Sequence, residues 1–385
     1  MNRRTQMIGL ALIAVVCGAS PTSAQTDGAT YWVYVGAESA DLVHLVRFGP
    51  DGAEVERTIP VGESPVETEG PHGLRMSPDG AYWYMTTGHG IPDGKLWKYA
   101  TGGDTLVAEP ILLGFFPATL DVTPDGLYAF VVNFNLHGEH VPSSVSVVYT
   151  PSMTEVTQTT TCTMPHGARI NATGDRLYSA CMMDDQIVEI STLSFEVERR
   201  FRVAKGEEGP ITEDHGHTMV DHADHGMSGG RALMPPASCS PTWALPSPNG
   251  EVVFVACNRG NEILEIDTDD WTLERKFAAG QGPYNLAITP DGETLIATLK
   301  QGAGIQFFDV ASGKSRGVVE SSTTVTHGVD VSPDGRYAFV SVEGVGAEPG
   351  KVDIIDIQRI ERVASVEVGQ QAGGIAFWKM ERSGS

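Results

Sequence analysis

The amino-acid sequence predicts an all-β fold, and three observations lead to this prediction. A motif of two short strands joined by a Pro-Asp-Gly turn, or a variant of it, recurs six times. The copies follow one another at the length of a four-stranded unit, and a seventh unit is divided between the two ends of the chain. Repetition at this period is typical of a ring of four-stranded blades. The predicted fold is therefore a seven-bladed β-propeller.

Each complete copy begins with a short apolar strand, passes through the turn and continues into a second strand of alternating residues. The six copies are PHGLRMSPDGAYWYM from Pro71, PATLDVTPDGLYAFV from Pro117, PHGARINATGDRLYS from Pro165, PTWALPSPNGEVVFV from Pro241, PYNLAITPDGETLIA from Pro283 and THGVDVSPDGRYAFV from Thr326. They start 42 to 48 residues apart, except for one gap of 76 residues between Pro165 and Pro241. Further alternating segments, such as EILEIDT from Glu262, supply the outer strands.

The divided unit predicts how the ring closes. The segment AGGIAFW from Ala372 reads as a first strand whose partners are missing, while YWVYVGA from Tyr31 begins three strands that lack a first. We therefore expect the C-terminal strand to pair with the N-terminal strands and complete blade 1. Closure of this kind removes the free sheet edges that an open array would expose.

At these repeats the chain resembles the YVTN-repeat propellers, the group that includes the YncE-like periplasmic proteins. The resemblance covers essentially the whole chain after the N-terminal segment. It implies the propeller fold and leaves the function open, because this scaffold hosts binding proteins, dehydrogenase subunits, lactonases and lyases.

The N-terminus predicts export. A basic start, MNRRTQ, precedes the apolar run MIGLALIAVV, which is too short to span a bilayer, and small residues follow. This pattern indicates a signal peptide over residues 1–24. Lipidation at Cys17 is the alternative, but Val16 stands where a small residue is needed. We expect a single propeller over residues 25–385, periplasmic or secreted, soluble and not inserted in a membrane.

The charge of the chain narrows the class of partner. The formal net charge is −23, and removing Arg3 and Arg4 with the signal peptide takes it to −25. A chain this acidic is unsuited to nucleic acids and anionic membranes and is compatible with cations, although solubility alone also explains the charge. We expect a monomer that binds no nucleic acid.

Four of the five cysteines follow the signal peptide, and their spacing is regular. Cys162 and Cys181 are 19 residues apart, and Cys239 and Cys257 are 18 residues apart. An even number of cysteines in an exported chain indicates disulfides. We predict the pairs Cys162–Cys181 and Cys239–Cys257, with a thiolate metal site as the alternative.

The one long gap between repeats contains an insertion over about residues 205–238. It includes the segment TEDHGHTMVDHADHGM, which carries His215, His217, His222 and His225 together with acidic residues, Met219 and Met227. The segment has no period of its own, so we interpret it as a flexible loop that captures cations.

The start of each first strand predicts a second cluster. In blades 2 to 7 and then 1, the residue before the apolar part of that strand is His72, Ala118, His166, Thr242, Tyr284, His327 and Gly373. This position lies at the mouth of the central channel. The histidines of blades 2, 4 and 7 are spread almost evenly around a seven-membered ring. Three converging imidazoles suit a first-row metal ion, whereas a structural bond to a neighbouring carbonyl is the simpler alternative for each one.

The repeat also assigns the other histidines to a face of the ring. Connections between blades and loops from second to third strands lie at the same end of the channel. We therefore expect His89, His137 and His140 beside the inserted loop, as additional candidate metal ligands. His44 falls within a third strand and is interpreted as structural.

Together these features predict a periplasmic metallochaperone or metal carrier. Exported zinc chaperones that serve ABC-type importers are similar in their general arrangement, which implies a metal-binding receptor or importer component as partner. Imidazole and carboxylate ligands favour zinc, while Met219, Met227, Met182 and Met183 would favour copper as Cu⁺ or Cu²⁺.

Two other functions are compatible with the sequence. The same three histidines could hold the metal ion of a lyase or lactonase-like enzyme, with Tyr284, Glu343 and Asp185 as candidate acids and bases. No established catalytic motif accompanies them. The third alternative is a protein-interaction scaffold.

Overall fold

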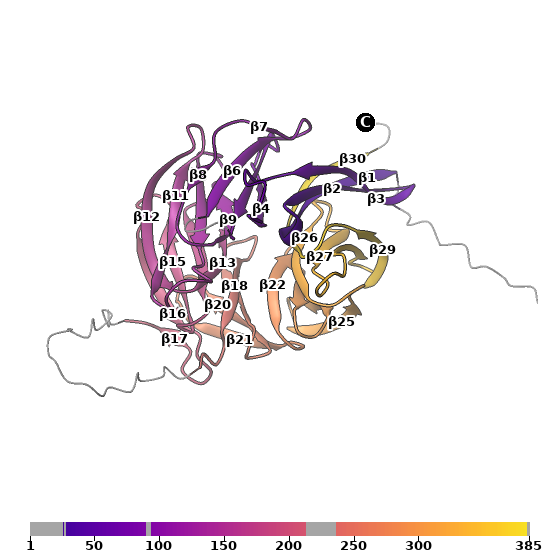
Figure 1. Cartoon of the computed structure of the whole chain (residues 1–385). Helices are drawn as coiled ribbons and strands as arrows, with labels where there is room; N and C mark the ends of the chain where they lie inside the picture. The colour runs from indigo at the N-terminus through magenta and orange to yellow at the C-terminus, as the bar shows by residue number, and fades with distance from the viewer. Residues whose placement is uncertain (1–25, 27, 90–93, 213–235, 383–385) are drawn as a thin grey trace, which may run out of the picture.

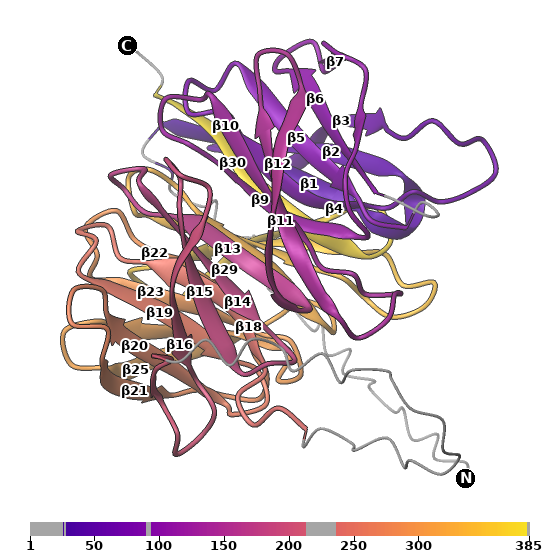
Figure 2. The same cartoon turned by 90° about the vertical axis from the view of Figure 1, so that its left-hand side faces the viewer.

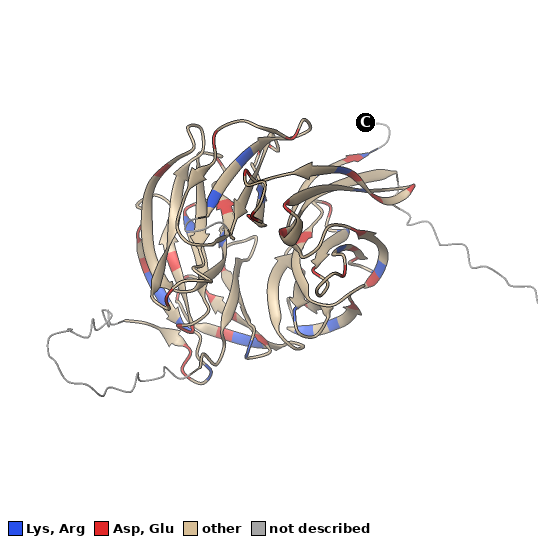
Figure 3. Ribbon diagram, in the orientation of Figure 1, with Lys and Arg blue, Asp and Glu red and all other residues tan. Residues whose placement is uncertain are grey.

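The computed structural model describes residue 26 and residues 28–89, 94–212 and 236–382. Seven antiparallel sheets stand around a common axis, and a single short 3-10 helix, η1 (Glu38–Ala40), is the only helix in these ranges (Figure 1). The predicted seven-bladed β-propeller is confirmed. Charged side chains of both signs are distributed around the ring (Figure 3).

The first four blades take up the N-terminal half and the C-terminal strand. Blade 1 contains β1 (Ala29–Ala37), β2 (Leu42–Gly49), β3 (Gly52–Pro60) and β30 (Ala372–Arg382). Blade 2 contains β4 (Pro71–Met76), β5 (Tyr82–Thr87), β6 (Lys95–Ala100), β7 (Thr105–Leu106) and β8 (Ile111–Leu112). Blade 3 contains β9 (Pro117–Val122), β10 (Tyr128–Asn133), β11 (Pro142–Tyr149) and β12 (Thr154–Thr163). Blade 4 contains β13 (Pro165–Ile170), β14 (Arg176–Cys181), β15 (Gln186–Ser191), β16 (Val197–Arg202) and β17 (Gly209–Pro210).

The last three blades follow the histidine-rich segment. Blade 5 contains β18 (Pro241–Pro246), β19 (Val252–Cys257), β20 (Glu262–Asp267) and β21 (Leu273–Ala278). Blade 6 contains β22 (Pro283–Ile288), β23 (Thr294–Leu299), β24 (Gly304–Asp309) and β25 (Lys314–Glu320). Blade 7 contains β26 (Thr326–Val331), β27 (Tyr337–Val342), β28 (Lys351–Asp356) and β29 (Glu361–Glu367).

The innermost strands form a closed cycle. Each of β4, β9, β13, β18, β22, β26 and β30 contacts the corresponding strand of both neighbouring blades, and β30 joins β26 to β4. β30 pairs antiparallel with β1, for example at Val33 with Phe377, which confirms the predicted closure of blade 1 by the C-terminal strand (Figure 2). Blades 1 and 7 also share a core, in which the rings of Tyr31 and Tyr337 lie 5.2 Å apart.

The Pro-Asp-Gly turns have a repeated local structure. In blade 2, the backbone N–H of Ala81 donates to Asp79 Oδ1 at 3.0 Å, and that of Tyr82 donates to Ser77 Oγ at 2.9 Å. Gly80 takes a φ of 68°, which glycine adopts without a steric penalty. The same Ser or Thr, Asp and Gly pattern therefore reverses the chain in several blades.

The described part of the chain contains two disulfides. Cys162 bridges to Cys181 and Cys239 to Cys257, which confirms the predicted pairing and removes these sulfurs as metal ligands. The first bridge joins β12 of blade 3 to β14 of blade 4. Disulfides indicate a periplasmic or extracellular protein.

No segment of the described ranges forms a helix with the length and apolar character needed to cross a membrane.

The insertion is partly structured where it is described. Gly209 and Pro210 add β17 to the edge of β16, a short strand that the sequence did not predict. Asp185 accepts hydrogen bonds from the backbone N–H groups of Ser238 and Ser240 at 2.5 and 2.7 Å. The described ends of the insertion are therefore held to blade 4 by hydrogen bonds.

The glycine that follows each channel histidine is required by the close approach of neighbouring blades. A Cβ on Gly167 would lie 2.3 Å from the Trp243 ring and 2.4 Å from the carbonyl oxygen of Thr242. A Cβ on Gly73 would lie 2.6 Å from a backbone oxygen of the next blade, and a Cβ on Gly328 would lie 2.9 Å from one. The His-Gly pairs thus allow the innermost strands to approach closely at the axis.

We predict that Gly167→Ala destabilises the protein by about 1 to 3 kcal/mol, because blades 4 and 5 must separate to admit the methyl group. Gly209→Ala is the matched control, since a Cβ there meets nothing within 4 Å. Urea unfolding measures both. Equal stability of the two variants would show that the blades are not in close contact at Gly167.

Candidate functional site

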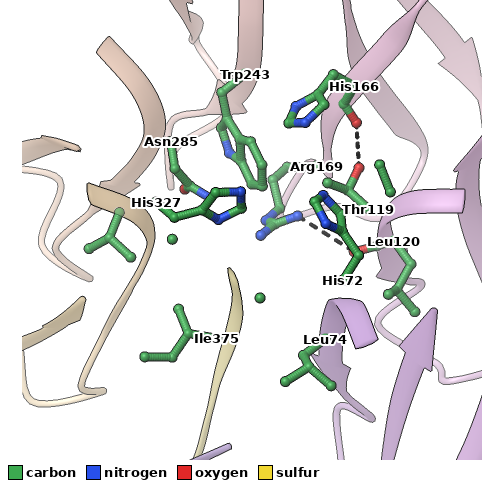
Figure 4. A pocket seen from close by; sticks show the side chains of 15 residues that line it. His72, Leu74, Thr119, Leu120, His166, Arg169, Trp243, Asn285, His327 and Ile375 are labelled. Carbon is green, nitrogen blue, oxygen red and sulfur yellow. Dashed lines mark hydrogen bonds between the residues drawn. The ribbon is translucent and has the colours of Figure 1, made fainter. Parts of the chain in front are cut away.

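The seven predicted ring positions lie together at one end of the channel, each as the second residue of an innermost strand. His72, His166 and His327 are buried, with exposed fractions of 8, 1 and 6%. The His72 ring centroid lies 6.3 Å from that of His166 and 5.5 Å from that of His327. The centroid of the Tyr284 ring lies 5.2 Å from that of His166 and 4.9 Å from that of His327. Residues from blades 2, 4, 6 and 7 thus form one cluster, and Figure 4 shows its three histidines beside the cavity that His72, His166 and His327 line.

His166 is held in one tautomer by two hydrogen bonds. Its Nδ1 lies 2.9 Å from the carbonyl oxygen of Thr242, which can only accept, so Nδ1 carries the proton. Nε2 therefore accepts the hydroxyl proton of Tyr284 at 2.9 Å. Burial, with a contribution from His72, lowers the pKa of His166 to about 3. At neutral pH this ring is uncharged.

Glu38 connects two of the histidines. Its Oε1 lies 3.1 Å from His72 Nδ1 and 2.6 Å from His89 Nε2, and Gln371 donates to its Oε2 at 3.0 Å. Burial alone would raise the pKa of this carboxyl, but His72 and His89 outweigh it and hold the pKa well below its usual range. The hydrogen bond to Glu38 in turn raises the pKa of His89. A carboxylate is therefore fixed at the channel mouth.

His327 faces a second carboxylate and a cation. Its Nε2 lies 3.8 Å from Glu343 Oε1, which also pairs with Lys300 Nζ at 2.9 Å. Lys300 Nζ lies 4.2 Å from the centroid of the Tyr284 ring. Burial and the charge of Lys300 lower the pKa of His327 well below its ordinary value, and burial raises the pKa of Tyr284. His327 is thus a neutral imidazole.

Two imidazoles have ring nitrogens that bond to nothing. His72 Nε2 and His327 Nδ1 are buried and have no hydrogen-bond partner among the described residues, and His72 Nδ1 meets Glu38 without hydrogen-bond geometry. Buried polar atoms are almost always paired. Since Zn–N bonds are about 2.1 Å long, imidazoles on one zinc ion have centroids about 5 Å apart. The 5.5 Å between His72 and His327 is close to this spacing, and the 6.3 Å between His72 and His166 is longer.

The cluster is nevertheless not a preformed metal centre. Over the described residues, no group of three or more His, Cys, Asp or Glu side chains is arranged to hold a metal ion. The reason is local, because the Tyr284 hydroxyl occupies the Nε2 lone pair of His166. Coordination by all three histidines requires this hydroxyl to move.

The other predicted residues divide into two sets. His89 and His137 lie near the cluster, with centroids 5.6 Å apart, and the exposed His140 contacts neither. His44 is structural as expected, since the Gly369 N–H donates to its Nε2 at 3.0 Å. Asp185, a candidate acid or base in the enzyme interpretation, is instead committed to backbone N–H groups after the insertion. His215, His217, His222 and His225 lie outside the described residues, as do Met219 and Met227.

Glu38 and Lys300 belong to the candidate site, and the sequence did not predict them. Both occupy the position immediately after a second strand, as Glu343 does in blade 7. In all seven blades the backbone N–H at this position donates within its own blade, to the carbonyl oxygen of the residue just before the innermost strand, as from Glu38 to Gln371 and from Lys300 to Gly282. Alignment of the repeats at this position, and not only at the histidines, would have found both residues.

Comparison with known proteins bears on the fold. No family model matches the chain, and no curated protein matches it. Among solved structures, a chain of hydrazine synthase from Kuenenia stuttgartiensis is similar with a TM-score of 0.57 and 19% identity, over 78% of this chain and 81% of that chain. At this identity the likeness shows the fold alone. Membership of the YVTN-repeat group stays a prediction.

We predict that acid destabilises the protein through its buried histidines. The pKa of His166 is about 3 in the folded chain and near 6.5 when unfolded, so between these values the unfolded state binds more protons and stability falls as pH falls. From pH 7 to pH 5 the loss from His166 alone is about 2 kcal/mol. Urea unfolding at both pH values measures it.

His166→Gln is the matched variant. It should be less stable at pH 7 but should lose less stability on acidification than the wild type. An unchanged pH dependence in this variant would contradict the assignment of His166 as a neutral buried imidazole.

Proposed function

We propose that this chain is an exported metal carrier whose channel-mouth histidines bind a divalent cation as cargo, with zinc favoured over copper. The observation that carries the proposal is the pair of buried, unpartnered nitrogens, His72 Nε2 and His327 Nδ1, on rings 5.5 Å apart. His327 is a neutral imidazole, and such a ring offers a lone pair to a metal ion without a proton to displace. The two disulfides support export.

The donor set supports zinc in preference to copper. The donor groups of the cluster are imidazoles, and the carboxyl groups of Glu38 and Glu343 contact the same rings at His72 Nδ1 and His327 Nε2; imidazole and carboxylate ligands suit zinc. Glu38 Oε1 lies 3.1 Å from His72 Nδ1, so a small rotation of the ring would let Glu38 accept a hydrogen bond from Nδ1 while Nε2 binds the ion, the outer-shell arrangement common for metal-ligating histidines. Met182, which would favour copper, packs against the apolar cluster of Phe116 and Phe134.

Tyr284 supports reversible binding. Its hydroxyl must leave His166 Nε2 before that nitrogen can bind the ion, and a typical hydrogen bond of this kind contributes about 1 kcal/mol. The bond therefore returns whenever the ion leaves. A carrier that releases its cargo to a receptor benefits from such a competitor, and His215, His217, His222 and His225 would supply weaker ligands for capture.

A metal-dependent lyase or lactonase-like enzyme is the second candidate. The hydrogen bond from Tyr284 to His166 and the neighbouring Lys300 favour it, because together they form an arrangement suited to acid–base catalysis. In that function the Tyr284 hydroxyl would be essential. The two proposals therefore differ in what loss of this hydroxyl does.

We predict that Tyr284→Phe strengthens zinc binding about fivefold, because it frees His166 Nε2 at the expense of one hydrogen bond. The variant with His72, His166 and His327 all replaced by alanine should lose the tight site. Isothermal titration of the mature protein with zinc measures both. Asn258→Ala, which alters blade 5 at the position that Glu343 occupies in blade 7, is the control and should bind as the wild type.

Weaker binding by Tyr284→Phe would favour Tyr284 as a ligand or catalytic group and count against the competitor role. Wild-type affinity in a folded triple-alanine variant, with folding checked by circular dichroism, would refute the channel-mouth site.

We predict that deletion of residues 213–235 leaves the affinity of the channel-mouth site within about twofold and slows zinc uptake. The reason is that the deletion removes four histidines but none of the channel ligands. Stopped-flow competition with a zinc-binding dye measures the rate. An unchanged rate would show that the segment does not serve capture.

A further inference from the structure

A second set of unpartnered polar groups lies on the channel axis below the histidines. Arg169, on β13 and three residues after His166, extends into a cavity of about 30 Å³ that is also lined by His72, His327, Trp243 and Asn285 (Figure 4). Its guanidinium carbon lies 4.6 Å from the centroid of the Trp243 ring. Nη1 donates to the carbonyl oxygen of Ala168 at 2.8 Å.

Arg169 differs from the other arginine of the channel. Arg75 occupies the same position on β4 and donates from Nε to Asp121 Oδ1 at 2.7 Å. Arg169 has no carboxylate within ion-pair distance in the described parts of the chain, although Asp121 and Asp330 are near enough to act on its pKa. Burial, with the charge of Arg75, lowers the pKa of Arg169 to about 10, so it is a cation at neutral pH.

Arg169 is half-buried, and a cation withdrawn from water without a counter-ion is unfavourable, so proteins normally supply a partner. Stacking on Trp243 compensates part of this penalty. Among the described residues the guanidinium finds acceptors only for Nη1, the carbonyl oxygens of Ala168 and Leu120, and the side chain lines the cavity. An anion in the cavity would complete the pairing.

The other walls of the cavity supply more donors. Trp243 Nε1 is buried and has no acceptor among the described residues, although a buried indole N–H normally finds one. Asn285 Oδ1 is also buried and unpartnered, and a half-turn of this amide would present its two N–H groups instead. Asn285 and Trp243 belong to neighbouring blades 6 and 5, so their donors converge on one space.

We propose that this cavity binds a small planar oxyanion of the one-carbon carboxylate class, such as formate or bicarbonate. A cavity of about 30 Å³ has room for about two water molecules, a size that suits a one-carbon acid. The planar fork of an arginine matches two carboxylate oxygens. Arg169 is the charged anchor, and Trp243 Nε1 supplies a second donor. The site does not depend on the proposed metal function, because its donors are present in the metal-free protein.

The test is a titration of the metal-free mature protein with sodium formate, followed by the indole N–H resonances of its six tryptophans. Trp243→Phe assigns the Trp243 signal. We expect that signal to shift and saturate at millimolar formate, with sodium chloride at the same concentrations giving a smaller shift. Bicarbonate in a second titration shows which oxyanion binds more tightly.

Arg169→Gln should weaken binding at least tenfold, while Arg47→Gln, which removes the same charge from an exposed pair with Glu54, should leave it unchanged. If Arg169→Gln does not fold, Arg169→Lys keeps the charge without the fork and should bind at least fivefold more weakly. No saturable shift of the Trp243 signal in the wild type, or equal affinity in a folded Arg169 variant, would overturn the proposal and leave the cavity as a water site. Because no metal is present, this result is separate from the zinc titrations.

Discussion

The packing of seven innermost strands around one axis is the constraint on which the rest of the structure depends. The strands approach so closely that Gly73, Gly167 and Gly328 cannot carry a side chain, while the preceding residue is left at the channel mouth. Residues separated by up to 255 positions, from His72 to His327, therefore meet within a few ångströms. The ring can close only because β30 returns to β1, so the site and the closure of the fold are coupled.

Desolvation influences the chemistry of the channel both at the histidine cluster of its mouth and at Arg169 below it. At the mouth it keeps His166 and His327 neutral, and the carboxyl groups of Glu38 and Glu343 lie beside the cluster. Below the mouth, Arg169 has no carboxylate within ion-pair distance among the described residues, although Asp121 and Asp330 are near enough to act on its pKa. A divalent cation above and an oxyanion below would share the cavity that His72 and His327 line, and binding of either would then favour the other to the same degree.

Much of the architecture could be predicted from the sequence because the relevant signals are periodic. The spacing of the Pro-Asp-Gly turns gave the number of blades, the divided unit gave the closure, and the regular cysteine spacing gave both disulfides. The same period placed His72, His166 and His327 at equivalent positions, and the structure brings these three together.

The details that decide the chemistry of the site are not periodic. Several contacts depend on side-chain conformations across blades. Tyr284 bonds to His166, and Glu38 contacts both His72 and His89. Among the described residues, Arg75 has a carboxylate partner and Arg169 has none. The short strand β17 follows from backbone pairing at a sheet edge, for which Gly209 and Pro210 give no sequence signal. The sequence presents Asp185 as a candidate acid or base, yet its carboxylate accepts hydrogen bonds from the backbone N–H groups of Ser238 and Ser240.

In the proposed function, the channel-mouth histidines bind a metal ion when the Tyr284 hydroxyl moves away from His166. Diffraction at the zinc absorption edge, from crystals of the mature protein grown with equimolar zinc, would locate the ion. We expect an anomalous peak about 2.1 Å from nitrogens of His72, His166 and His327, with the Tyr284 hydroxyl displaced. Zinc found only on surface carboxylates, with the bond from Tyr284 to His166 intact, would contradict it.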